Sequence, residues 1–139
     1  MKGLPTLIRL SKFRLDEARR QLAELERLRE HLLQGLQRLA AEVAREQQVA
    51  AASQDPHSGY ASYARAAMAR RATIEQSLAD LAPKLGDAAN AVTAAFQEMK
   101  RYELAEEHSR RRGEGKRKRR EAAALDETAL GRFHRAKAG

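Results

Sequence analysis

The chain has 139 residues, of which 33% are charged and only 4% are aromatic, and it contains neither Trp nor Cys. A composition rich in Leu, Ala and charged residues is typical of long helices or coiled coils, and not of a compact core built on aromatic anchors. The lack of Cys excludes disulfides and Cys-ligated metal sites. No apolar run approaches the roughly 18 residues of a membrane span. Residues 1–10 hold too short an apolar stretch for a signal peptide, so we expect a cytoplasmic protein.

The net charge of +8 is unevenly distributed along the chain. Residues 1–50 carry 10 basic and 7 acidic side chains, residues 51–105 carry 6 of each, and residues 106–139 carry 11 and 6. The basic excess therefore lies in the first part of the chain and, more heavily, in the C-terminal tail. Such an asymmetry favours an acidic partner, which is a protein surface, a nucleic acid or an anionic lipid.

Apolar residues recur in alternating steps of three and four along residues 6–50. Nine of the eleven positions in this seam are apolar, and Ser11 and Arg29 are the exceptions. A period of 3.5 residues keeps one stripe facing a partner helix in a coiled coil, so we predict a long helix that begins near Thr6, after Pro5. The seam residues are Ile8, Ser11, Leu15, Ala18, Leu22, Leu25, Arg29, Leu32, Leu36, Leu39 and Val43.

A strong break follows at residues 53–59, where Asp-Pro and Ser-Gly pairs are typical of a turn. Beyond it, a second seam predicts another helix over residues 60–105. Its apolar positions are Ile74, Leu78, Leu81, Leu85, Ala88, Val92, Ala95, Met99 and Tyr102. Long helices joined by a short link pack as antiparallel neighbours. We therefore predict an all-α protein with an antiparallel two-helix coiled-coil hairpin over residues 1–105, and a swapped dimer is the alternative that stays open.

Pro83 lies inside the second seam. A proline in the interior of a helix removes a backbone hydrogen bond and costs about 3 kcal/mol. The register from Leu81 to Leu85 is unbroken across it. We therefore predict a kink within one helix, in preference to a break into two.

The seam stops after Ala105, and residues 106–139 form a separate basic tail. Eight of the twelve residues 109–120 are basic, and their mutual repulsion, together with Gly113 and Gly115, opposes a free helix. Residues 121–135 regain a weakly amphipathic helical pattern. We expect this tail to be partly disordered until a partner orders it.

The sequence contains no group of residues that is typical of an active site. His31, His57, His108 and His134 lie in separate regions without metal-binding spacing. The Gly-Glu-Gly run at residues 113–115 lacks the strand and helix of a phosphate-binding loop. We therefore predict a protein that is not an enzyme, needs no cofactor or metal, takes no small-molecule substrate and works by binding other proteins.

The basic run is also compatible with nucleic acid, because phosphate contacts need only clustered Lys and Arg. No aromatic platform for stacking bases interleaves with the run, which disfavours nucleic acid as the main partner. Apolar wedges beside the charges are missing as well, which disfavours a membrane surface.

The chain resembles the FliJ family of the bacterial flagellar type III export system. The resemblance rests on the size, the two seams, residues 7–19 (LIRLSKFRLDEAR) and a basic C-terminal region followed by Glu121, residues 125–127 (LDE) and Leu130. It implies a fold like the central stalk of rotary ATPases, and a role in flagellum assembly and motility. The implied partners are the flagellar export ATPase, whose ring the protein enters, the export gate protein and the export chaperones. The implied location is the cytoplasm, with peripheral attachment to the inner membrane through these partners.

We expect the ATPase contact at the end of the hairpin that joins the N-terminus, residue 105 and the tail. The basic residues predicted to form this contact are Lys12, Arg14, Arg19, Arg20, Lys100, Arg101, Arg110, Arg111, Arg112, Lys116, Arg117, Lys118, Arg119 and Arg120. The turn end is near neutral and suits a second partner such as the export gate. The alternatives are another bacterial coiled-coil adaptor, including an injectisome stalk-like protein, and a nucleic-acid-binding protein with a basic tail.

Overall fold

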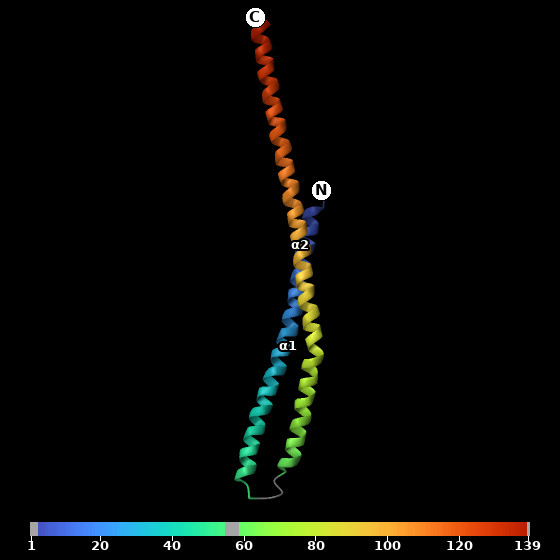
Figure 1. Cartoon of the computed structure of the whole chain (residues 1–139), viewed down its shortest axis with the longest axis vertical. Coiled ribbons are helices and arrows are strands. Elements are labelled where there is room, and N and C mark those ends of the chain that lie inside the picture. Colours follow the sequence, from blue (N-terminus) through green and yellow to red (C-terminus); the bar gives the residue numbers. More distant parts are fainter. Residues whose placement is uncertain (1–2, 55–58, 139) are drawn as a thin grey trace. The chain divides into compact units, whose positions relative to one another are not determined.

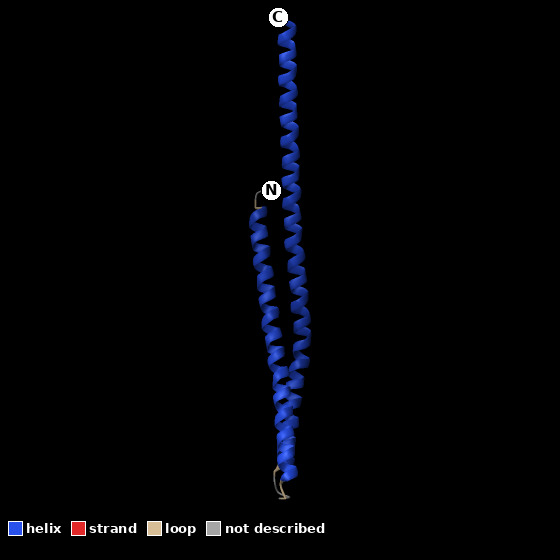
Figure 2. Cartoon of the chain, turned by 90° about the vertical axis from the view of Figure 1, so that its left-hand side faces the viewer, coloured by secondary structure: helices blue, strands red, loops and turns tan. Residues whose placement is uncertain are grey.

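A computed structural model describes residues 3–54 and 59–138 of the chain, and the described residues form two long α-helices and no strand. Helix α1 spans Leu4–Ala52 and helix α2 spans Tyr60–Ala138. Figure 1 shows the two helices coloured along the sequence, and Figure 2 shows that helix accounts for nearly all of the described chain. The predicted all-α class is therefore confirmed. The central residues of the predicted turn, 55–58, lie outside the described residues.

The residue contacts divide the chain into two compact units. The helical-pair unit is Arg14–Ala95, and the terminal unit is Met1–Phe13 together with Phe96–Gly139. Both helices contribute to each unit, because the division falls within α1 and again within α2. The two units are described in turn.

In the helical-pair unit, α1 and α2 pack against each other through apolar side chains. Leu15, Leu39, Ala67 and Leu81 are buried, with exposed fractions between 3% and 6%. Gly35 of α1 faces Ile74 of α2. A Cβ atom added to this glycine would lie 3.7 Å from the isoleucine side chain. A Cβ at this distance would make an ordinary van der Waals contact, so this part of α1 lies directly against Ile74 of the α2 seam.

Residues later in α1 contact residues earlier in α2. Arg70 forms an ion pair of 3.8 Å with Glu42, seven residues beyond the Gly35 contact, and Tyr60 and Tyr63 lie beside Val49 in a shallow pocket. The order of these contacts is the one expected of two helices joined by a short link.

Glycine residues precede both helices. Gly3 and Gly59 have φ angles of +99° and +76°, in the left-handed region that an L side chain rarely adopts. Their carbonyls accept the first hydrogen bonds of the helices, from the amides of Leu7 and Tyr63 at 3.0 and 3.1 Å. Pro5 is tolerated in the first turn of α1, where a backbone N–H has no helical partner in any case.

Helix α2 continues through Pro83 and is one helix there. The predicted kink at this proline stays a prediction. Leu81 is buried at 4% exposed and Leu85 is half-buried. Apolar packing on both sides of the proline offsets the lost backbone hydrogen bond.

The second helix does not end at residue 105 as the sequence predicted, since α2 runs on to Ala138. Two ion pairs between residues four apart support the extension, Arg111 with Glu107 at 2.6 Å and Arg117 with Glu121 at 4.0 Å. Three alanines, at residues 122–124, add strong helix formers. These ion pairs and alanines offset the like-charge repulsion and the glycines that favoured an earlier end of the helix. The expected partial disorder of the tail in solution stays a prediction.

In the terminal unit, the first turns of α1 pack on α2. Leu4, Ile8 and Met99 are buried, and so is Ser11, whose hydroxyl donates a hydrogen bond of 2.7 Å to the Ile8 carbonyl. A polar side chain is tolerated in this seam because its hydroxyl is satisfied by its own helix.

Candidate interaction surfaces

The two units differ in net charge. The helical-pair unit carries 11 basic and 11 acidic side chains, and the terminal unit carries 16 basic and 8 acidic ones. The whole net charge of +8 therefore belongs to the terminal unit. Divisions at residues 50 and 105 of the sequence do not reveal this partition, because contacts and not chain order define the units.

The predicted basic site residues fall into both units. Arg14, Arg19 and Arg20 belong to the helical-pair unit, and the other eleven belong to the terminal unit. The terminal-unit residues are Lys12, Lys100, Arg101, Arg110, Arg111, Arg112, Lys116, Arg117, Lys118, Arg119 and Arg120. The structure therefore groups most, but not all, of the predicted set in one compact unit.

Several of these cations already have partners on their own helix. Lys100 lies 3.5 Å from Glu103 and 5.6 Å from the centre of the Phe96 ring. Arg20 pairs with Glu17 at 2.5 Å, and both side chains are more than a third exposed. Exposed pairs of this kind contribute about 0–1 kcal/mol, so they leave the cations available for exchange with a stronger partner.

The basic run of α2 is exposed on every side. All eight basic residues at 110–112 and 116–120 are exposed. Because an α-helix turns once in 3.6 residues, five consecutive basic residues at 116–120 encircle the helix. Within the described part of the chain, no carboxylate pairs with Lys116, Lys118, Arg119 or Arg120. The helix is therefore positively charged on all sides in this segment, and not on one face only.

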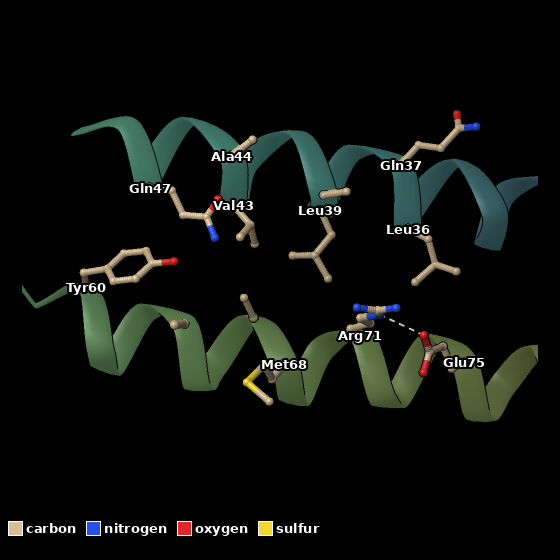
Figure 3. Close-up of a pocket in the computed structure, with 13 residues that line it drawn as sticks. Leu36, Gln37, Leu39, Val43, Ala44, Gln47, Tyr60, Met68, Arg71 and Glu75 are labelled. Carbon is tan, nitrogen blue, oxygen red and sulfur yellow. Dashed lines mark hydrogen bonds and ion pairs between the residues drawn. The ribbon is translucent and has the colours of Figure 1, made fainter. Parts of the chain in front are cut away.

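Two of the grooves between α1 and α2 in the helical-pair unit differ in character. The larger one, called the apolar groove, has a volume of about 590 Å³. It is lined by Leu36, Gln37, Leu39, Ala40, Val43, Ala44, Gln47, Tyr60, Ala64, Ala67, Met68, Arg71 and Glu75. Figure 3 shows Leu36, Leu39 and Val43 pointing from α1 towards α2 in this groove.

Arg71 and Glu75 are the charged residues of this lining, and they form an ion pair with each other at 2.8 Å. The dashed line in Figure 3 marks this pair. The apolar groove therefore carries no net charge. Met68 contributes to its lining although its side chain is 70% exposed.

The second groove, of about 230 Å³, shares Leu39 with the first and contains His31, Arg38, Glu42 and Arg70. Arg38 lies two positions before Ala40 of the apolar groove, and Glu42 lies two positions before Ala44. Two positions correspond to about 200° around an α-helix. The two grooves therefore open on opposite faces of the helical-pair unit, one apolar and one charged.

Most predicted seam residues are buried or half-buried. The buried ones are Ile8, Leu15, Leu39, Leu81 and Met99. The half-buried ones are Leu22, Leu25, Leu32, Leu36, Val43, Ile74, Leu78, Leu85, Val92 and Tyr102. Arg29 is exposed, as suits a long side chain whose head stays in water. The second seam, extended backward from Ile74 in the same steps, also passes through Ala67, which is buried at 6%.

Among the described residues, no three His, Asp or Glu side chains converge in a way that would hold a metal ion. No helix in the described ranges combines the length and apolar character that crossing a bilayer requires. The candidate functional features of the described chain are two surfaces. One is the basic segment that encircles α2 in the terminal unit, and the other is the apolar groove of the helical-pair unit.

These features define a helical interaction protein, with two long packed helices and a concentrated positive charge. The model of the FliJ family, described as flagellar FliJ protein, matches residues 1–138. The chain therefore belongs to the FliJ family, a family of non-catalytic components of the flagellar export apparatus. The comparison with curated proteins and the comparison with solved structures give no match.

Proposed function

We propose that this chain works in the flagellar export apparatus as an antiparallel coiled-coil hairpin whose basic terminal unit enters or contacts the ring of the export ATPase. The observation that carries this proposal is the encircling basic segment of residues 110–120, in the unit that holds the whole net charge. A flat acidic surface neutralises only one side of such a helix. A ring lumen or a deep cleft lined by carboxylates neutralises all sides at once.

The strength of such a contact comes from many weak pairs. Each exposed pair contributes about 0–1 kcal/mol, so several must act together. Long-range attraction of this kind mainly raises the rate of association and makes it sensitive to salt. The apolar seam of the terminal unit, with Ile8 and Met99 buried, supplies a rigid support for the charges.

The helical-pair unit is the candidate for the second set of partners. It is electroneutral and carries the two tyrosines at the start of α2, Tyr60 and Tyr63, whose rings lie 6.5 Å apart. We propose that the export gate protein and export chaperones contact this unit. Attachment to the inner membrane is then peripheral and depends on those partners.

The test replaces residues 116–120 with glutamine, which removes five positive charges and keeps a good helix former at each position. We expect binding to the export ATPase to weaken about tenfold or more, because five weak pairs are lost together. A matched control replaces five exposed arginines of the helical-pair unit, Arg27, Arg29, Arg38, Arg45 and Arg65, with glutamine.

Binding and stimulation of the ATPase are measured by pull-down and by phosphate release, with circular dichroism as the folding control. A folded variant at residues 116–120 that binds and stimulates like the parent contradicts the proposal. If that variant keeps ATPase binding but loses duplex DNA binding, with a steep salt dependence in the parent, the nucleic-acid alternative is correct.

A further inference from the structure

The apolar groove is an anomaly in a chain that is one-third charged. Its charged side chains, Arg71 and Glu75, neutralise each other at 2.8 Å. Met68 leaves 70% of its side chain in water although it belongs to this apolar lining. The opposite face of the same unit carries Arg38 and the ion pair between Arg70 and Glu42 instead. An apolar stripe beside the seam, confined to one of two faces, is the pattern of a helix pair that packs against further helices.

Charge restricts what can cover this groove. A strongly charged partner helix would lose hydration there and find no net opposite charge in return. Two copies of the helical-pair unit do not repel each other through net charge, since each carries 11 basic and 11 acidic side chains. The excess of +8 that would drive copies apart belongs to the terminal unit.

The groove is also chemically complementary to itself. The amides of Gln37 and Gln47 both donate and accept hydrogen bonds, so each can pair with the same residue type. Arg71 and Glu75 carry opposite charges four residues apart, so two copies can exchange these partners. Small side chains, such as Ala40, allow close approach, and a flexible methionine fills irregular gaps. Self-complementarity of this kind is the requirement of a two-fold symmetric interface.

We infer that two copies of this chain associate through the apolar groove, helical-pair unit against helical-pair unit, with Met68 of each copy covered by the other. The interface adds two helices from the second copy to the two of the first. This association goes beyond the proposed role in export, and it does not depend on it.

The first measurement is sedimentation equilibrium of the purified full-length chain over a range of concentrations. We expect a reversible transition from 15.5 kDa to twice that mass. Raising the salt concentration is expected to preserve or strengthen the dimer, because salt screens the repulsion between the basic terminal units and leaves an apolar interface intact. A monomer at every concentration up to about 1 mM overturns the inference.

The second measurement compares Met68→Glu with Thr73→Glu, a control on the same helix that lines neither groove. Two like charges placed opposite each other in an interface repel each other, so Met68→Glu is expected to raise the dimer dissociation constant about tenfold or more. Thr73→Glu is expected to leave the constant unchanged within about twofold. Circular dichroism shows that both variants are folded. A dimer that survives Met68→Glu arises from exchanged helices or from the tail, and that outcome overturns the inference.

The chain contains no Cys, which allows a direct check with single-cysteine variants. Met68→Cys is expected to give a cross-linked dimer with a short bismaleimide reagent, and Thr73→Cys is expected to give much less. Equal cross-linking of the two variants at the same protein concentration reflects random collision and overturns the assignment to the groove.

Discussion

Leu39 is the most informative position for testing the packing of the helical-pair unit. Its side chain is 5% exposed and lies between the two grooves. Replacing it with alanine removes three carbon atoms, each worth about 0.8 kcal/mol of apolar burial, so the transfer term is about 2.4 kcal/mol. A cavity in a closed core adds to this term. Here the site opens to solvent on both sides, so we expect a total loss near the low end of the usual range, about 2–3 kcal/mol.

The assay is urea unfolding followed by circular dichroism, with Leu33→Ala as the matched control on the same helix. Leu33 is 36% exposed, so about two-thirds of the same transfer term applies and its truncation is expected to cost about 1.5 kcal/mol or less, with no closed cavity to add to it. Leucine and alanine have similar helix propensities, so the difference between the two variants reports burial and not helix formation. Equal losses at the two positions would refute the packing of the α1 seam against α2.

Two further predictions concern the same unit. Pro83→Ala is expected to stabilise the chain by about 1–3 kcal/mol in urea unfolding, because α2 is already helical there and alanine restores the missing backbone hydrogen bond; a loss of stability would show that the helix needs the bend of a proline. Glu42→Gln is expected to cost less than about 1 kcal/mol, because the ion pair with Arg70 at 3.8 Å is between side chains that are 42% and 66% exposed. A double-mutant cycle with Arg70→Gln measures the coupling of this pair, and a coupling energy well above that value would show that the pair is buried in solution.

The positions of the two helices in the sequence were predictable because their periodicity is local. Predicted bounds of residues 6–50 and a start at residue 60 compare with Leu4–Ala52 and Tyr60. Gly59 and the turn sequence that precedes it, where the apolar seam is interrupted, mark the start of α2 in any context. The end of α2 was not predictable in the same way. It depends on a balance between charge repulsion and ion pairs four residues apart, and each of these contributes only a few tenths of a kcal/mol.

The helical class, the apolar seam along each of the two helices and the large excess of positive charge are all evident from the amino-acid sequence. Those properties follow from composition and from a period of 3.5 residues, and neither requires knowledge of distant contacts. The packing of the two helices defines which residues share a unit, and therefore that one unit is electroneutral while the other holds the whole +8. It also decided that the two faces beside the seam differ, because a groove such as that around Met68 is formed jointly by two helices whose relative rotation no single helical pattern specifies.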